Sequence, residues 1–323
     1  MEIIEQMTEF DIAKETAVAI GKFDGFHRGH QKLLDELRRQ KENGLATVVF
    51  TFVPSPAVFF GLAPAGELTT IAEKRRIFEN AGVDYLIEYP FCQEIADMEP
   101  ERYIKNVLIE QIHAKCIVAG DDVSYGRHGA GDYRLLQKKS SVYGYQVIII
   151  DKVLYKGKEV SSTYVREEVK KGNMELVECL LGAPYRIGGE IVHGKQLGRT
   201  IGMPTVNLLP PSEKLLPPKG VYYSYARFCG GADSQKPYPA ITNIGTKPTV
   251  DNQCVMGVET FIYNFNQDVY GAELEVFLLH FKRPERRFDS VEALKAQMTA
   301  DIAAGREYHQ IPFHAAEQLS LIK

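Results

Sequence analysis

The first half of the chain alternates short apolar runs with stretches whose apolar residues recur every three or four positions. Apolar runs predict buried strands, and the three-to-four spacing predicts helices with one buried face. Near-continuous apolar strands that alternate with helices are typical of a parallel sheet covered on both faces. The expected strands are residues 17–20, 45–52, 83–87, 116–119 and 147–150, and the expected helices are residues 30–43, 73–80 and 99–112.

After about residue 185 the pattern changes to strand-like runs with many aromatic residues and no helices between them. Turn residues such as Pro217-Pro218 and Gly230-Gly231 separate these runs. Consecutive strands of this kind favour an antiparallel barrel or sandwich. Asp289 and Glu292 have the spacing of a capping box before a final helix. The expected strands of this half are residues 220–228, 238–244, 255–265 and 273–281.

Composition adds a domain count and excludes some functions. The 323 residues carry 38 basic and 42 acidic side chains, a formal net charge of −4, and 45% of them are hydrophobic. This composition excludes general disorder, and the length favours two domains because single cores rarely exceed about 250–300 residues. From the change of pattern we expect domains at residues 1–182 and 183–323. The lack of a basic excess argues against a dedicated nucleic-acid binder.

The sequence also favours a cytoplasmic protein without a membrane partner. Its first ten residues carry three acidic side chains instead of the basic start and apolar run of a secretory signal. No apolar run approaches the roughly 20 residues that span a bilayer. The five cysteines are widely spaced and form no CxxC pair, which argues against a disulfide framework or a zinc site. The oligomeric state is left open by these features.

A glycine-rich turn, residues 21–30 (GKFDGFHRGH), joins the first expected strand to the first expected helix. Ligands of open α/β sheets bind at the carboxyl ends of strands, and a helix N-terminus there favours phosphate. His27 and His30 lie three residues apart, so they can project to one side of the helix. Two imidazoles beside a phosphate can stabilise the charge that builds up in phosphoryl or nucleotidyl transfer. The alternative, a capped turn with two surface histidines, fits this strand–turn–helix context less well.

Two further segments of the first half have residue types suited to a ligand site. Residues 160–166 (VSSTYVR) place hydroxyl side chains at the start of a helical pattern, where they are first of all N-caps. Arg166 adds a guanidinium that can clamp a phosphate. Residues 120–127 (GDDVSYGR) directly follow an expected strand, a position that fits ligand binding, although by itself the segment is a turn.

The second half opens with a basic, glycine-bounded segment, residues 194–208 (GKQLGRTIGMPTVNL). On a strand, Thr205 and Asn207 would point to one face, and their oxygens suit Mg²⁺. Taken without the rest of the second half, the segment favours a basic surface turn before a β-strand. Residues 189–196 match the spacing of a P-loop only as far as the lysine, because Gln196 replaces the required Ser or Thr and no helix follows. We therefore reject a P-loop.

Together, and in this order, the motifs resemble those of the bacterial bifunctional riboflavin kinase/FAD synthetases. The adenylyltransferase module is suggested by residues 21–30, TFVPSP at 51–56, GDDVSYG and SSTYVR, although Val123 and Tyr125 stand where the family usually has phenylalanine. The riboflavin kinase module is suggested by PTVN at 204–207, GVY at 220–222, NIGTKPT at 243–249, VETF at 258–261 and DVYG at 268–271.

The resemblance implies an α/β Rossmann-like nucleotidyltransferase domain, followed by a mainly antiparallel riboflavin kinase-like β-barrel with a C-terminal helix. It also implies two ATP-dependent reactions with Mg²⁺: phosphorylation of riboflavin to FMN, then adenylylation of FMN to FAD with release of pyrophosphate. The expected partners are these small molecules and not nucleic acid. Two alternatives stay open at this point. One is an adenylyltransferase for another phosphorylated acceptor with an inactive barrel, and the other is a nucleic-acid-binding protein with a degenerate HxGH site.

For the first domain the resemblance implies that His27 and His30 are catalytic and stabilise charge on the α-phosphate. Asp122, Tyr125 and Arg127 would contact the flavin. The residues expected to contact ATP are Gly21, Phe23, Asp24, Gly25, Ser161, Ser162, Thr163 and Arg166.

For the second domain the resemblance implies that Glu259 is the general base, which takes the proton from the ribityl 5′-hydroxyl. By spacing alone, an outward strand carboxylate is the favoured interpretation of Glu259. Thr205 and Asn207 would hold the metal. The residues expected to contact ATP are Gly194, Lys195, Gly198, Arg199, Gly202, Pro204 and Asn243.

Overall fold

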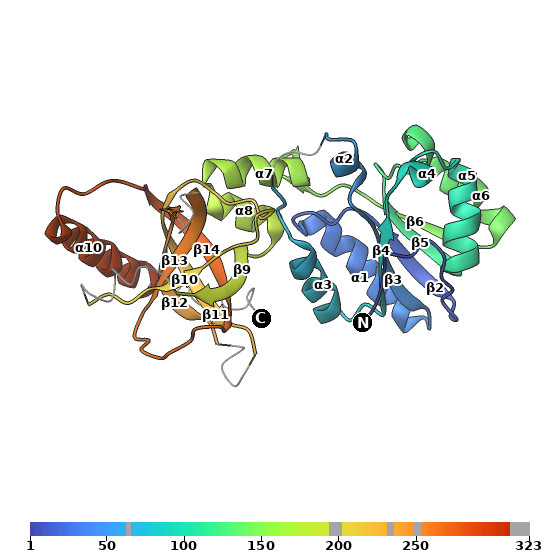
Figure 1. Cartoon of the computed structure of the whole chain (residues 1–323). Helices are drawn as coiled ribbons and strands as arrows, with labels where there is room; N and C mark the ends of the chain where they lie inside the picture. The colour runs from blue at the N-terminus through green and yellow to red at the C-terminus, as the bar shows by residue number, and fades with distance from the viewer. Residues whose placement is uncertain (63–65, 194–201, 231–235, 249–253, 311–323) are drawn as a thin grey trace. The chain divides into compact units, whose positions relative to one another are not determined.

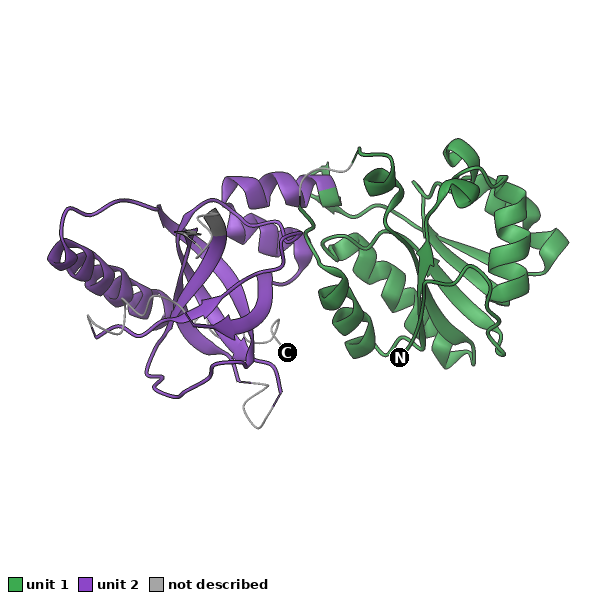
Figure 2. Cartoon of the chain, viewed as in Figure 1, with its two compact units in different colours: residues 1–162 green, residues 163–323 purple. Residues whose placement is uncertain are grey.

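The computed structural model describes residues 1–62, 66–193, 202–230, 236–248 and 254–310. The chain forms two compact units, residues 1–162 and residues 163–323 (Figure 2). The first contains a parallel sheet and the second a closed barrel (Figure 1). Helices α7 (Ser162–Lys171) and α8 (Met174–Leu181) precede the barrel strands, so the division between the units falls earlier than residue 182. The domain limits 1–182 and 183–323 stay a prediction.

The first unit is built on a six-stranded sheet with the strand order β1-β4-β3-β2-β5-β6. Every neighbouring pair in it is parallel, which confirms the arrangement expected from alternating strands and helices. The first strand, β1, was not predicted, because only two of its four residues are apolar and a glutamate stands at each end. The strands are β1 (Glu2–Glu5), β2 (Thr16–Ile20), β3 (Ala46–Val53), β4 (Tyr85–Pro90), β5 (Ala114–Gly120) and β6 (Gln146–Ile150).

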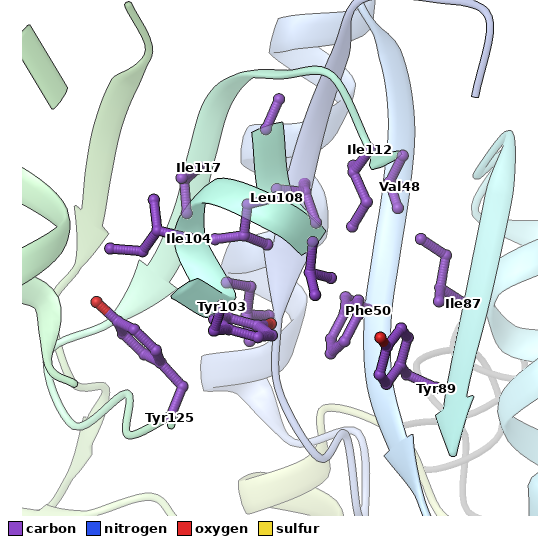
Figure 3. Close-up of a cluster of buried hydrophobic side chains, with 14 of the residues drawn as sticks. Val48, Phe50, Ile87, Tyr89, Tyr103, Ile104, Leu108, Ile112, Ile117 and Tyr125 are labelled. Atoms are coloured by element: carbon purple, nitrogen blue, oxygen red, sulfur yellow. The ribbon is translucent and has the colours of Figure 1, made fainter. Parts of the chain in front are cut away.

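Helices cover both faces of this sheet. Successive strand residues point to opposite faces, so Ala17 of β2 packs in a cluster with Leu37 of α1, whereas Val18 packs in a second cluster with Leu108. Figure 3 shows much of the second cluster, including Phe50 of β3. The helices and small strands of this unit are α1 (Arg28–Glu42), α2 (Pro56–Phe59), α3 (Ile71–Asn80), α4 (Gln93–Ala96), α5 (Pro100–Arg102), η1 (Tyr103–Gln111), η2 (Arg127–Gly129), α6 (Tyr133–Tyr143), β7 (Leu154–Tyr155) and β8 (Lys158–Glu159).

The segment 99–112 is helical as expected, but most of it is a π-helix, η1, that follows the short α5. Ile104, Leu108 and Ile112, whose spacing predicted the helix, are all fully buried. The backbone N–H of Ile112 donates to the carbonyl of Val107, five residues earlier, at 3.1 Å. Apolar spacing therefore identified the buried face correctly but not the hydrogen-bond pattern.

The second unit is a closed barrel in which neighbouring strands run antiparallel, in the order β10-β13-β12-β11-β14-β9. Ser224, Thr242 and Thr260 lie fully buried on three adjacent strands, and their hydroxyls form a ladder with distances of 2.8 and 2.9 Å. This pairing satisfies polar groups that burial would otherwise leave unmatched. The strands are β9 (Tyr185–Val192), β10 (Val206–Leu208), β11 (Gly220–Phe228), β12 (Tyr238–Pro248), β13 (Cys254–Ile262) and β14 (Glu273–Pro284).

The last described helix, α10 (Val291–Gln310), is confirmed, but its cap differs from the expected one. The hydroxyl of Ser290, not Asp289, accepts the backbone N–H of Ala293 at 3.1 Å. The N-cap side chain must reach the third residue of the helix, and from Ser290 that residue is Ala293. Among the residues that the structure describes, no helix is long and apolar enough to cross a membrane.

Candidate active sites

The glycine turn between β2 and α1 is fastened to the loop that precedes α3. A side-chain oxygen of Asp24 accepts the backbone N–H groups of Leu68 and Thr69 at 2.9 and 3.2 Å. The N–H of Gly25 donates to the hydroxyl of Thr69 at 3.0 Å, and the hydroxyl of Ser162 donates to the carbonyl of Asp24 at 2.8 Å. These bonds hold the turn in one conformation at the carboxyl edge of the sheet, where ligands of such folds bind.

His27 is the N-cap of α1, and its Nδ1 accepts the backbone N–H of Gly29 at 3.2 Å. A neutral imidazole that accepts at Nδ1 carries its proton on Nε2, so His27 has an N–H available for a ligand. A Cβ at Gly29 would come within 3.0 Å of the imidazole. The glycine therefore leaves the room that this cap needs.

The rings of His27 and His30 stack, with centroids 3.9 Å apart and an interplanar angle of 22°. The ring of Phe23 lies 5.1 Å from that of His30. The Nδ1 of His30 is buried and has no hydrogen-bond partner among the described residues. A buried polar atom without a partner is costly and is typical of a site that a ligand completes. The predicted pair thus lies together and in one compact stack.

Burial makes both imidazoles weak bases. It lowers the pKa of His27 to about 4, against the opposing effect of Asp122, Asp24 and Glu159. The pKa of His30 also lies well below its usual value, because of burial first and then the nearby His27 and Lys74. At neutral pH both rings are therefore uncharged and act through their N–H groups. The effect of Asp122 on His27 also brings this exposed residue of the third motif to the same site.

The remaining residues expected to contact ATP have different environments. Phe23 is fully buried, with its ring 5.2 Å from that of Phe78, and Gly21 donates its N–H to the carbonyl of Phe50 at 3.1 Å. Both residues support the turn from the core side. Ser161 and Ser162 end the first unit. Thr163 and Arg166 follow in α7 within the second unit, where Thr163 is exposed and Arg166 is buried.

Of the residues expected at the flavin, the structure exposes Asp122 and Arg127 but buries Tyr125. The Tyr125 ring lies in the core cluster, 5.2 Å from the ring of Tyr103, and its hydroxyl donates to the carbonyl of Asp132 at 3.2 Å (Figure 3). Burial raises the pKa of Tyr125. Arg127 pairs with Glu99 at 3.6 Å. A flavin contact of Tyr125 stays a prediction, and any such contact would need an approach to a covered ring.

An exposed apolar patch on the short helix α2 and the residues directly after it was not identified from the sequence. It comprises Val58, Phe59, Phe60 and Leu62, and Leu62 is 78% exposed. The ring of Phe91, which follows β4, lies 5.3 Å from that of Phe59. Exposed aromatic residues at the carboxyl edge of a sheet mark a binding surface. The TFVPSP motif at residues 51–56 was the available signal, but sequence pattern alone cannot show that the apolar residues after it are exposed.

The barrel brings its predicted site residues into one row through strand register. Glu259 of β13 lies directly opposite Asn207 of β10 on one side and Asn243 of β12 on the other. The row continues through Val221 of β11 to Arg283 of β14. Residues opposite each other across strands share a face. Asn207, Asn243 and Glu259, which come from separate motifs, are therefore neighbours on one face of the barrel, and Arg283 joins them there.

This face opens into a cavity of about 230 Å³ that is lined by apolar residues of the barrel and α10 and by several polar side chains. The polar side chains are Thr205, Thr242, Asn243, Glu259, Arg283, Glu285, Arg286 and Asp301. The carboxylate of Glu259 thus lines a cleft that offers both apolar surface and polar groups, as ligand sites commonly do. Helix α10 contributes Leu294, Met298 and Ile302 to the lining. Their spacing of four residues places them on one face of the helix.

Thr205 lies between this cavity and a second one of about 60 Å³, since it lines both. Pro204 and Tyr270 also line the smaller cavity, and the Tyr270 ring stacks on His193 with centroids 3.7 Å apart. Thr205 immediately precedes β10 and so is not within the strand as expected. Gly202 is exposed. Four residues expected to contact ATP, Gly194, Lys195, Gly198 and Arg199, lie outside the described residues.

A set of polar residues that the sequence analysis missed joins α10 to the barrel. Nε and Nη2 of Arg283 donate to Oδ2 of Asp301 at 3.0 and 2.6 Å. The amide of Gln297 donates to Oδ1 of Asp301 at 2.8 Å. Asp301 is only 4% exposed, so this is a buried ion pair. It fastens the helix over the cavity, and no local sequence pattern links these residues.

A histidine pair at the edge of a parallel sheet and a carboxylate-lined cavity on a barrel define a two-domain enzyme. Family models for FAD synthetase and for riboflavin kinase match residues 9–164 and 181–309. The bifunctional riboflavin kinase/FMN adenylyltransferase of Escherichia coli (strain K12) is 37% identical over 294 residues, which cover 90% of this chain and 92% of that protein. The chain therefore belongs to the bifunctional riboflavin kinase/FMN adenylyltransferase family.

Other comparisons agree over nearly the whole chain. The Buchnera aphidicola (subsp. Schizaphis graminum) protein of the same name is 34% identical over 304 residues, covering 93% of this chain and 96% of that protein. A crystal structure from Streptococcus pneumoniae, described as a macrolide-efflux protein, has a TM-score of 0.79 at 30% identity and covers 94% of this chain and 98% of that one. The resemblance stated from the motifs and the fold class expected from it are confirmed.

Proposed function

We propose that this chain carries out both reactions of its family. The barrel unit transfers the γ-phosphoryl group of ATP to the 5′-hydroxyl of riboflavin, which gives FMN and ADP. The sheet unit then joins the phosphate of FMN to the α-phosphorus of a second ATP, which gives FAD and pyrophosphate. The observation that carries this proposal is that each unit has its own site: the stacked histidine pair in one and the cavity around Glu259 in the other.

In adenylyl transfer, an oxygen of the FMN phosphate attacks the α-phosphorus of ATP while the bond to pyrophosphate breaks. No protein nucleophile is needed, so the enzyme must position the reactants and stabilise charge. We assign this stabilisation to the N–H groups of His27 and His30. Asp24, with Gly25, holds the turn against residues 68–69, so we assign it a positioning role. Arg166 stays our candidate for the phosphates of the leaving group.

For the flavin side of this site we propose the exposed patch formed by Val58, Phe59, Phe60 and Leu62. Its aromatic rings can stack on the planar ring system of a flavin. The chain has no tryptophan, so phenylalanine or tyrosine must supply this stacking. Asp122 and Arg127 are exposed after β5 at the same edge of the sheet, which supports their assignment.

For the kinase, the larger cavity supports a flavin site and the smaller one a nucleotide site. The first combines apolar side chains with the carboxylate of Glu259. The second is lined by Tyr270, whose ring stacks on that of His193. Thr205 lines both cavities, so a phosphoryl group passing from one to the other would cross beside it. Glu259 would then take the proton of the attacking hydroxyl.

Mg²⁺ is the metal that we propose for this step. The hydroxyl of Thr205 and the amide oxygen of Asn207 are hard ligands, and the register puts Asn207 beside Glu259. Among the described residues, no group of three or more His, Cys, Asp or Glu side chains could hold a metal by itself. These neutral oxygens therefore fit an ion whose coordination is completed by ATP. When bound, it would neutralise phosphate charge.

A single time course tests the proposal. The full chain is incubated with riboflavin, ATP and Mg²⁺, and riboflavin, FMN and FAD are separated and quantified over time. We expect FMN to rise first and FAD to follow. FAD from supplied FMN without any FMN from riboflavin would support an adenylyltransferase with an inactive barrel. The absence of both products would refute the proposal.

For the cellular location we propose a reducing cytoplasm. Four cysteines are free thiols, which supports this location: Cys92, Cys116, Cys179 and Cys229.

A further inference from the structure

Lys74 lies on the face of α3 that is turned toward the histidine pair. It precedes Phe78 by four residues, so the two side chains share one face of the helix. The Phe78 ring lies 5.2 Å from that of Phe23, and the Phe23 ring in turn lies 5.1 Å from that of His30. The Lys74 charge also acts on His30, where it disfavours protonation. This face of α3 therefore belongs to the surroundings of the adenylyltransferase site.

The start of α3 is held firmly in this place. Thr70 caps the helix in a capping box with Glu73. The two residues before this cap, Leu68 and Thr69, donate their backbone N–H groups to Asp24 of the glycine turn. Lys74 comes one helical turn after the cap. The backbone of Lys74 is therefore held in place relative to the glycine turn by the capping box and by the hydrogen bonds to Asp24. Its side chain is long and flexible and can adjust to a ligand.

Adenylyl transfer requires positive charge that the histidine pair does not supply. The stacked rings of His27 and His30 are neutral at pH 7, because burial lowers the pKa of each. Pyrophosphate, however, leaves with additional negative charge as its bond to the α-phosphorus breaks. Neutral N–H donors stabilise such charge less than an ammonium group does.

The Lys74 ammonium group forms a loose ion pair, which leaves it able to bind a phosphate. Its side chain is only 15% exposed, and it pairs loosely with Glu67, with 3.9 Å between Nζ and the nearest carboxylate oxygen. That distance is longer than a hydrogen bond. A phosphate oxygen could therefore attract the ammonium group without breaking a tight contact.

We propose that Lys74 is a phosphate-binding residue of the adenylyltransferase site, and that Glu67 is its counter-ion when no nucleotide is bound. During the reaction an FMN oxygen forms a bond to the α-phosphorus, the bond to the β-phosphate oxygen breaks, and the electron pair leaves with pyrophosphate. Lys74 binds the β- or γ-phosphate oxygens on which this charge collects. The inference rests on the proposed function of the same unit.

Steady-state kinetics of Lys74→Met in the full chain test this assignment. The variant keeps the aliphatic stem but removes the charge. We expect kcat/KM for ATP in FAD formation from supplied FMN to fall on the order of 10- to 100-fold, the effect of losing one hydrogen bond to a charged group. KM for pyrophosphate in the reverse reaction should rise, and KM for FMN should change little. Lys74→Arg keeps the charge and should restore most of the activity.

Lys105→Met is the matched control, since Lys105 also pairs loosely with a carboxylate, Glu110, at 3.8 Å but lies on η1. FMN formation from riboflavin serves as an internal control, because it depends on the barrel unit. If Lys74→Met lowered kcat/KM for ATP no more than Lys105→Met does, the assignment would be overturned. Unchanged KM values for both ATP and pyrophosphate would overturn it as well. Absence of FAD formation by the wild type would instead refute the proposed function.

Discussion

The Nδ1 of His27 accepts the backbone N–H of Gly29, and its ring stacks on that of His30 at 3.9 Å. One contact sets the tautomer and the other sets the orientation of the pair. Burial lowers the pKa of both rings, and for His30 the nearby His27 lowers it further. The pair therefore acts as a fixed set of hydrogen-bond donors.

The first prediction concerns the activity of this pair. Replacing both histidines, His27→Ala and His30→Ala, should lower FAD formation from supplied FMN by about 100-fold or more, as removal of transition-state donors does. FMN formation from riboflavin should persist, because it depends on the other unit. Separate assays of the two half-reactions measure this. Unchanged FAD output from the double variant would contradict the catalytic assignment.

The second prediction concerns the stability of the first unit below neutral pH. The pKa of His27 is about 4 in the folded chain and 6.5 in its ordinary state, so between these values the unfolded chain binds more protons. The stability from this residue is complete above pH 6.5 and is lost as the pH falls toward about 4. The total loss is roughly 3 kcal/mol.

His27→Asn checks this, because asparagine can still cap α1 but does not titrate. Urea unfolding at about pH 7.5 and about pH 5 should show a smaller loss of stability in the variant than in the wild type. His128→Asn, at an exposed position of the same unit, serves as the control. An identical loss in His27→Asn and the wild type would argue against the burial effect.

The third prediction concerns the kinase base. Glu259→Gln keeps the shape of the side chain but removes the proton acceptor, so FMN formation should fall by about 10²- to 10⁴-fold. Conversion of supplied FMN to FAD should be unaffected. Glu273→Gln, which removes an exposed carboxylate from β14, is the control and should leave both rates near those of the wild type. Normal FMN formation by Glu259→Gln would rule out the base role.

The fourth prediction compares two glycines with positive φ. A Cβ at Gly25 would lie 2.8 Å from Leu68, whereas a Cβ at Gly44 would meet nothing within 4 Å. Each substitution by alanine should cost about 1 kcal/mol for the left-handed backbone. Gly25→Ala should cost more, because it also pushes the turn away from residue 68, and it should reduce FAD formation. Equal urea midpoints and equal FAD rates in the two variants would show that this packing is unimportant.

The fifth prediction concerns the buried pair of Arg283 and Asp301. Asp301→Ala leaves a largely buried guanidinium without its partner, which should destabilise the barrel by about 3 kcal/mol or more. Because α10 lines the cavity, KM for riboflavin should rise while FAD formation from FMN is retained. Thr299→Ala on the exposed side of α10 is the control. If Asp301→Ala had the same KM for riboflavin as Thr299→Ala, the ion pair would have no role in substrate binding.

The local sequence pattern was sufficient to predict most helices and strands and the glycine turn. It did not predict which side chains of the loops and short helices are buried. Tyr125 stood in a segment with the spacing of a ligand loop, yet its ring packs on Tyr103 in the core. Phe59 and Phe60 belong to an apolar run after a strand, yet they are exposed. Residues far away in the chain determine how much of a side chain is covered. The sequence around Tyr125 or Phe59 therefore could not show which of them is buried and which is exposed.

By itself, the sequence determined the alternation of strands and helices, the aromatic-rich strands of the second half and the position of both histidines at a helix start. These features depend on contacts within a few residues. Only the tertiary structure decided that Asn207, Glu259 and Asn243 form one row, that Asp301 fastens α10 over the cavity and that the charge of Lys74 acts on His30. Such relationships depend on strand register and helix packing, which bring together residues far apart in the chain.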